Sequence, residues 1–199
     1  MELTFSKDRI ILNKKLNALD RFVLKFTAIL EEKKIRFVLV SGYVSILFGR
    51  NRTSEDVDMF VERLTYERFE DLWNTLTGTF ECINTTDVKD AYHEYIAEGL
   101  SLRFSKKGTF IPNIELKFPK VKLDTWTLTQ RKTLLLNRQL LFISPLELQI
   151  PYKLFLGSEK DIEDAAYLFE LIKEYLDSEL LTEFNTKLKT TKVFRKYLL

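Results

Sequence analysis

FVLVSGYVSILFGRNRTSEDVDMFVE, from Phe37 to Glu62, is the most informative stretch of this sequence. Its opening apolar run is short enough for a buried strand, and Gly42 then permits a tight turn at which backbone can approach a ligand closely. A short buried helix that Gly49 ends suits the apolar residues Val44, Ile46, Leu47 and Phe48. After a polar loop, Asp56 and Asp58 alternate with apolar residues, which predicts a second strand with both carboxylates on one face.

Two carboxylates on one face of a strand repel each other unless a positive charge lies between them. A divalent cation is the simplest such charge, and Mg²⁺ prefers oxygen ligands to histidine or cysteine. The pair Asp56 and Asp58 is therefore a candidate metal-binding pair.

The stretch resembles the nucleotidyltransferase superfamily typified by DNA polymerase beta. That family has a strand, a Gly-Gly or Gly-Ser turn at a helix start, and Asp-x-Asp on the next strand. Here Ser41-Gly42 is the turn, with serine in the first position instead of glycine. Together with Arg52-Thr53, the spacing looks most like minimal prokaryotic nucleotidyltransferases, including the toxin-like branch related to abortive-infection AbiEii proteins.

A third carboxylate lies in that superfamily on a later strand beside the Asp-x-Asp strand. Glu115 is the candidate here, because it alternates with apolar residues in the strand pattern of NIELKF, residues 113–118. A lone carboxylate in an apolar run needs a compensating charge. The alternative is an exposed residue on a half-buried strand that pairs with Lys117 or another neighbour.

A late motif extends the resemblance to the AbiEii-like branch. That branch has a helix-borne lysine, a short linker and Asp-x-x-Asp at the start of the next helix; Lys153, Asp161 and Asp164 match it, and Lys160 stands where the branch often has arginine. The resemblance implies that Lys153 contacts nucleotide phosphates and that Asp161 helps position or activate. Alternatively, Asp161 only favours the helix N-terminus and pairs with Lys153.

The activity that the resemblance implies is transfer of a nucleoside monophosphate from a nucleoside triphosphate to an acceptor, which depends on positioning and charge neutralisation. Two Mg²⁺ or Mn²⁺ ions would be held by Asp56, Asp58 and Glu115. The implied nucleotide-binding residues are Ser41, Gly42, Arg52, Thr53 and Lys153, and Asp161 joins the three metal ligands as a catalytic candidate.

Composition predicts a folded, soluble chain. Its 199 residues are 45% hydrophobic and 30% charged, with few glycines and prolines, which argues against disorder. Net charge is only +2, but residues 55–98 carry −9 and residues 101–140 carry +7. This split suits an acidic metal-binding edge that faces a basic phosphate-binding surface, or ordinary scatter between solvated faces.

Several site classes are excluded by residue counts. Cys82 is the only cysteine, so no intrachain disulfide or cysteine-based zinc site is possible, and His93, the only histidine, is expected at a surface helix position. The N-terminus does not resemble a signal peptide and no apolar run is long enough for a membrane span, so a cytoplasmic location without membrane contact is expected.

The predicted fold is α/β (α+β), a nucleotidyltransferase fold with a mixed sheet of about five strands flanked by helices, plus a helical C-terminal region. We expect a catalytic domain over residues 1–143 and helices over 144–199. The helix over 9–34 has an apolar stripe that packs on the sheet or forms a dimer seam. A hairpin is expected around Asn137-Arg138, and a helix starts at Ser144-Pro145. Five strands are predicted over residues 37–40, 56–62, 80–83, 100–104 and 114–118.

The acceptor and the biological setting remain open. RNA or protein is the implied acceptor if the chain is the toxin of a toxin–antitoxin pair, with a cognate antitoxin as partner. One alternative is a non-catalytic nucleotide-binding or regulatory protein that kept the fold. Another is a small-molecule nucleotidyltransferase similar to aminoglycoside-modifying enzymes. The sequence does not specify the nucleotide or the oligomeric state.

Overall fold

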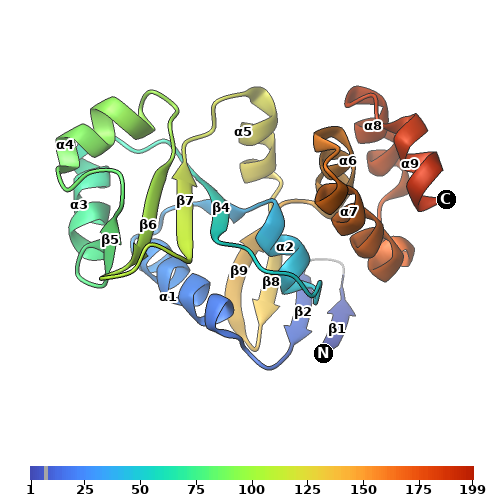
Figure 1. Cartoon of the computed structure of the whole chain (residues 1–199), viewed down its shortest axis with the longest axis horizontal. Coiled ribbons are helices and arrows are strands. Elements are labelled where there is room, and N and C mark those ends of the chain that lie inside the picture. Colours follow the sequence, from blue (N-terminus) through green and yellow to red (C-terminus); the bar gives the residue numbers. More distant parts are fainter. Residues whose placement is uncertain (7–8) are drawn as a thin grey trace.

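A mixed nine-stranded sheet forms the centre of the computed structural model, which describes residues 1–6 and 9–199 (Figure 1). The strand order within these residues is β1-β2-β8-β9-β3-β4-β7-β6-β5. The strands are β1 Glu2–Phe5, β2 Arg9–Asn13, β3 Phe37–Leu39, β4 Asp56–Val61, β5 Phe80–Cys82, β6 Leu102–Lys106, β7 Asn113–Lys117, β8 Lys132–Leu136 and β9 Gln139–Ile143. The β4 strand is central, because it pairs antiparallel with β3 and parallel with β7.

The expectation of about five strands was wrong. The five strands expected from residue 37 to residue 118 are present as β3 to β7, but β1, β2, β8 and β9 extend the sheet beyond β3. These four strands join the rest of the sheet where β9 pairs parallel with β3, at Ile143 and Leu39. They include the predicted hairpin, whose turn residues Asn137 and Arg138 have φ of 48° and 69°.

The predicted helix over residues 9–34 begins later than expected. Ile10 and Leu12 are buried while their neighbours are less so, and this period of two belongs to strand β2. The helix starts after Asn17, whose side chain accepts from the backbone N–H of Asp20 while the Asp20 carboxylate accepts from that of Asn17. This reciprocal cap fixes the helix start and leaves residues 9–13 free to pair with β8.

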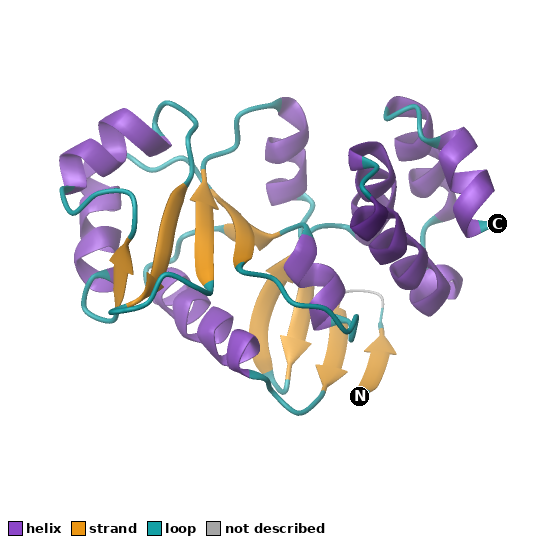
Figure 2. Ribbon diagram, in the orientation of Figure 1, coloured by secondary structure: helices purple, strands orange, loops and turns teal. Residues whose placement is uncertain are grey.

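The helices cover the sheet and form a separate group at one end, as Figure 2 shows. They are α1 Ala18–Glu32, α2 Gly42–Leu47, α3 Tyr66–Leu76, α4 Val88–Asp90 with a π-helix over Ala91–Ile96, α5 Lys122–Thr129, α6 Leu146–Leu156, α7 Glu159–Ile172 with a 3₁₀ turn over Lys173–Tyr175, α8 Ser178–Lys187 and α9 Thr191–Leu198. The group at one end consists of α6 to α9.

The start and the end of α6 show how local sequence positions this group. Pro145, rather than Ser144, occupies the N-cap position. Pro151 lies inside the helix without ending it, and Gly157 ends it with a left-handed φ of 72°. Glycine adopts this conformation without the steric cost that a side chain brings, so the chain turns sharply into α7.

A single hydrophobic core joins the sheet to these helices. It contains buried residues of β3 and β4 together with Ile150 and Leu154 of α6 and Leu168 of α7. Full burial of each such side chain contributes about 1.5–3 kcal/mol. The helical group is thus held against the sheet by apolar packing, and the functional candidates lie where the two meet. In the part of the chain that the structure describes, no helix has the length and apolar content needed to cross a membrane.

Candidate functional site

Two adjacent parallel strands present polar side chains on one sheet face. Asp56 pairs in register with Asn113, and Asp58 pairs with Glu115. Along both strands the intervening residues are buried, so alternation places these four side chains together on the opposite face. The predicted convergence of Asp56, Asp58 and Glu115 on one face is therefore what the backbone register produces.

The carboxylates on this face are already paired with cations from the chain. The Nζ of Lys117 lies 2.8 Å from Oδ1 of Asp58 and 2.8 Å from Oε2 of Glu115. Arg103, opposite Glu115 on β6, donates to its other carboxylate oxygen at 2.7 Å. We call Asp56, Asp58, Glu115, Lys117 and Arg103 the sheet-face cluster. Lys117 was foreseen only as an alternative partner of Glu115, and its contact with Asp58 was not predicted.

Charge pairing shifts the titration of this cluster. Partial burial alone raises the pKa of the Glu115 carboxyl, but hydrogen bonds from Lys117 and Arg103 lower the pKa further, to below its usual range. Burial alone lowers the pKa of the Lys117 ammonium, yet Asp58 and Glu115 outweigh it and raise that pKa. Glu115 and Lys117 therefore both remain charged at neutral pH. Asp56 is held differently, because its Oδ1 accepts a 2.7 Å hydrogen bond from the Asn113 amide.

A cleft of about 240 Å³ opens beside this cluster. Asp58 and Lys117 line it from the sheet, Ser41 from the turn before α2, and Tyr152 from α6. Helix α5, which the sequence did not predict, also lines the cleft, through Leu123, Asp124 and Thr127. The predicted turn and the second predicted aspartate thus share one cavity.

The Ser41-Gly42 turn has a strained and well-fixed backbone. Ser41 has a φ of 59°, a left-handed value uncommon for a residue with a side chain. The amide of Gln149 holds it by donating to the Ser41 carbonyl at 2.8 Å and accepting from its N–H at 3.3 Å. A Cβ at Gly42 would lie 2.4 Å from Nη2 of Arg52, so a side chain there would displace this guanidinium. Gln149 is thus a supporting residue that sequence reasoning missed.

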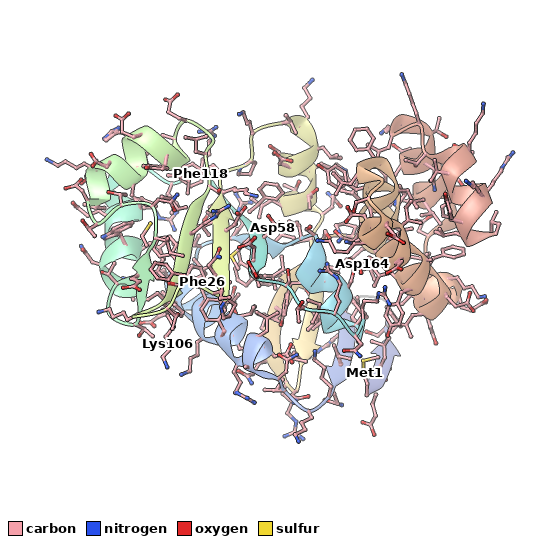
Figure 3. The ribbon with its side chains drawn as sticks, in the orientation of Figure 1. Met1, Phe26, Asp58, Lys106, Phe118 and Asp164 are labelled. Carbon is pink, nitrogen blue, oxygen red and sulfur yellow. The ribbon has the colours of Figure 1, made fainter. Side chains whose placement is uncertain are left out.

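Three other predicted residues, Arg52, Lys153 and Asp161, meet in a second ionic cluster, which is centred on the buried Asp164. Lys153 donates to Asp164 at 2.7 Å and lies 3.4 Å from Asp161, and Arg52 grips both oxygens of Asp164 at 2.9 and 3.1 Å. The side chains of Lys153 and Asp164 are 1% and 0% exposed. We call Arg52, Lys153, Asp161 and Asp164 the interhelical cluster; Figure 3 labels Asp164 here and Asp58 in the sheet-face cluster.

Burial and charge act in opposite directions on Asp164. Burial alone raises the pKa of this carboxyl, but Lys153 and Arg52 together hold it below its usual range. None of the interhelical residues lines the cleft. Thr53 is exposed, and its carbonyl accepts from Arg52 at 3.1 Å. Lys153, Asp161, Arg52 and Thr53 therefore do not line the cleft that Asp58 and Ser41 share, and their predicted contacts with nucleotide stay predictions.

The donor set of the sheet face suits one divalent cation. Mg²⁺ is usually held by one or two carboxylates plus substrate phosphates and water. Asp56 and Asp58 provide such a pair on one face of β4, and Asp58 lines the cleft. Within residues 1–6 and 9–199, no three acidic, histidine or cysteine side chains are arranged to hold a metal together. The reason is visible at Glu115, whose two oxygens are occupied by Lys117 and Arg103.

Comparison with known proteins gives a fold. No family model matches the chain, and no curated protein matches it by sequence. Among solved structures, it is similar to an antigenic nucleotidyltransferase-like protein from Paracoccidioides brasiliensis, with a TM-score of 0.53, 18% identity, and coverage of 92% of this chain and 94% of the other. It is also similar to the antibiotic-resistance factor ANT(2'')-Ia, with a TM-score of 0.53, 10% identity, and coverage of 90% and 97%. The chain therefore shares the fold of nucleotidyltransferase-like proteins over nearly its whole length.

Proposed function

We propose that the chain is a divalent-metal-dependent nucleotidyltransferase that moves a nucleoside monophosphate from a nucleoside triphosphate to an acceptor. The observation that carries this proposal is the meeting of Asp58 and Ser41 at one cleft, with Glu115 paired in register beside Asp58 on the same sheet face. The fold shared with nucleotidyltransferase-like proteins supports it.

Each residue has a distinct task in this proposal. Asp56 and Asp58 hold the cation, with the Asn113 amide keeping Asp56 in place. A bound Mg²⁺ supplies positive charge for the triphosphate and orients it. The Ser41-Gly42 backbone, fixed by Gln149, lets phosphate approach closely. Helix α5 and Tyr152 form walls of the cleft and would contact the bound nucleotide or acceptor.

The chain's two parts would contribute to one site. Residues 1–143 supply the metal pair and the turn, and residues 144–199 supply Gln149 and Tyr152. We therefore retain the division at residue 143 as a proposal, with the cleft at the boundary.

The acceptor and the biological setting belong to the same proposal. The basic segment 101–140 contributes β6 and β7 beside the acidic strand β4, so an RNA acceptor has a basic surface nearby. A protein acceptor, a toxin role in the AbiEii-like branch and a cognate antitoxin rest on the sequence resemblance alone. Small hydroxyl compounds also enter the test, because the cleft volume of about 240 Å³ suits a small group.

A non-catalytic nucleotide-binding protein is the second candidate. The observation that favours it is the pairing of Glu115 with both Lys117 and Arg103, which leaves that carboxylate no free oxygen for a metal. In this case the fold binds nucleotide but transfers nothing.

Labelled transfer decides between the two. Each nucleoside triphosphate, labelled at the α-phosphate, is incubated with the protein, Mg²⁺ or Mn²⁺, and total RNA, total protein or a panel of small hydroxyl compounds. Wild type should label one acceptor class and Asp58→Asn should label none. The matched control is Asp71→Asn on α3, which breaks an ion pair between Asp71 and Lys33, and it should behave as wild type. Nucleotide binding without transfer to any acceptor would favour the non-catalytic candidate.

A further inference from the structure

The strongest unassigned feature is the position of Lys117 between two carboxylates. Its Nζ lies 2.8 Å from Asp58 and 2.8 Å from Glu115, on a strand whose register with β4 fixes all three side chains on one face. A metal shared by the same two carboxylates would need this space. Lys117 follows Glu115 by two residues, so strand alternation delivers it there.

We propose that Lys117 serves as the fixed cation on the acceptor side of the site, so that the protein binds one divalent ion with its nucleotide instead of two. This inference rests on the proposed function. The remaining ion belongs to Asp56 and Asp58, whose other contacts leave carboxylate oxygens available, because Lys117 and Asn113 each engage only Oδ1.

Charge repulsion supports a single ion. A second ion shared by Asp58 and Glu115 would lie beside the Lys117 ammonium, which is 2.8 Å from both carboxylates. Two positive charges at such short range repel each other, so the fixed ammonium disfavours a divalent ion at the same place. Burial strengthens the effect, because the side chains of Lys117 and Glu115 are only 32% and 12% exposed.

Arg103 makes Lys117 the deciding residue. Arg103 reaches Oε1 of Glu115, whereas Lys117 reaches Oε2 and Asp58 together. Removing Lys117 therefore frees one oxygen on each of two neighbouring carboxylates, while Arg103 still holds Glu115 in position. The freed pair of oxygens is the donor arrangement that a second ion requires.

Counting bound Mn²⁺ tests the inference without reference to activity. Wild type and Lys117→Met are titrated with Mn²⁺ in the presence of a non-hydrolysable nucleoside triphosphate, and bound ion is counted per chain by electron paramagnetic resonance. Nucleotide affinity is measured separately by calorimetry. Wild type should bind one Mn²⁺ and Lys117→Met two, whereas Lys117→Arg, which keeps the charge, should bind one. Lys122→Met, on an exposed lysine at the start of α5, is the matched control and should bind one.

The outcomes separate the two proposals. Two ions in wild type, or one in Lys117→Met, would overturn the fixed-cation role and leave nucleotidyl transfer intact. No bound nucleotide in wild type would overturn the proposed function, and the inference with it. If Lys117→Met fails to give a wild-type circular dichroism spectrum, Lys117→Gln takes its place, with the same count expected.

Discussion

The two ionic clusters have similar composition and opposite settings. Asp58 and Lys117 of the sheet-face cluster line a cleft, and their side chains remain 28% and 32% exposed. In the interhelical cluster, Lys153 and Asp164 are 1% and 0% exposed, and neither lines that cleft. Ligands therefore have more direct access to the first pair than to the second. We propose ligand binding for the first cluster and a stabilising role for the second.

The energetic consequences of disruption differ accordingly. Breaking a buried ion pair by removing one partner leaves an uncompensated charge away from water, whereas a partly exposed pair is replaced by hydration. Arg52 connects the second cluster to the first region, because its guanidinium packs on Gly42 while it grips Asp164. The interhelical cluster thus supports the Ser41-Gly42 turn through Arg52.

Replacing Asp164 should have the largest effect on stability. Asp164→Asn leaves Lys153 buried beside only Asp161, at 3.4 Å, and removes the bidentate partner of Arg52. We expect a loss of about 3–5 kcal/mol in the free energy of unfolding, measured by urea denaturation. Asp71→Asn, in an ion pair whose aspartate is 63% exposed, should cost at most about 1 kcal/mol. Equal losses in both variants would contradict the contrast between the clusters.

Replacing Lys153 should have a smaller effect, because Arg52 remains to neutralise Asp164. Lys153→Met keeps much of the buried volume and should cost about 1.5–3 kcal/mol, the range for a hydrogen bond to a charged group. Nucleotide affinity, measured by calorimetry, should not change.

The nucleotide-binding role that the sequence resemblance implies for Lys153 predicts otherwise. Loss of a charge-assisted hydrogen bond to phosphate would weaken binding by about 1.5–3 kcal/mol, roughly ten- to a hundredfold in Kd. Such a loss in a folded Lys153→Met protein would place this lysine in the nucleotide site and show that the sealed cluster opens.

Acid should weaken the interhelical cluster gradually. The folded-state pKa of Asp164 lies below the value of the unfolded chain, because Lys153 and Arg52 stabilise its charge. This pairing therefore contributes its full stability above the unfolded pKa, and this contribution is lost as the pH falls through the folded pKa. Each unit of pKa difference is worth about 1.4 kcal/mol. Thermal melts of wild type at decreasing pH should show this loss, and Asp164→Asn should lack that part of the slope. If the melting temperatures of wild type and Asp164→Asn fell in parallel with pH, the acid sensitivity would come from other carboxyl groups.

The sequence was most informative where local periodicity alone determines structure. Strand alternation places Asp56 and Asp58 on one face, and the structure confirms this arrangement. The contact of Lys117 with Asp58 depends on the register between β4 and β7, which neither strand specifies alone. The same limit explains β2, where the apolar residues Ile10 and Leu12 also fit a helical stripe until the capping residues at Asn17 are recognised.

Burial is the other property that the sequence did not provide. Lys153 and Asp161 are close along the chain and match a functional motif, but only packing of α6 against α7 shows that Lys153 is sealed from the cleft. Arg52 is more than a hundred residues away from Asp164 in sequence, so their bidentate pair was not predictable from local patterns. A motif can therefore mark an ionic cluster without indicating whether ligand reaches it.

Asp58→Asn should change stability least, although it should remove transfer. The side chain of Asp58 is 28% exposed and Lys117 keeps Glu115 as a partner, so we expect a change within about 1 kcal/mol in the free energy of unfolding without metal. Ligand should reveal the difference. At a ligand concentration of 100 Kd, the free energy of unfolding of the wild type rises by about 2.7 kcal/mol. The variant should gain little, because it lacks one of the two aspartates that would bind the cation. Thermal melts with and without Mn²⁺ and a non-hydrolysable nucleotide measure both quantities. A loss of several kcal/mol without ligand would mean that Asp58 stabilises the fold as Asp164 does, and the contrast between the two clusters would then fail.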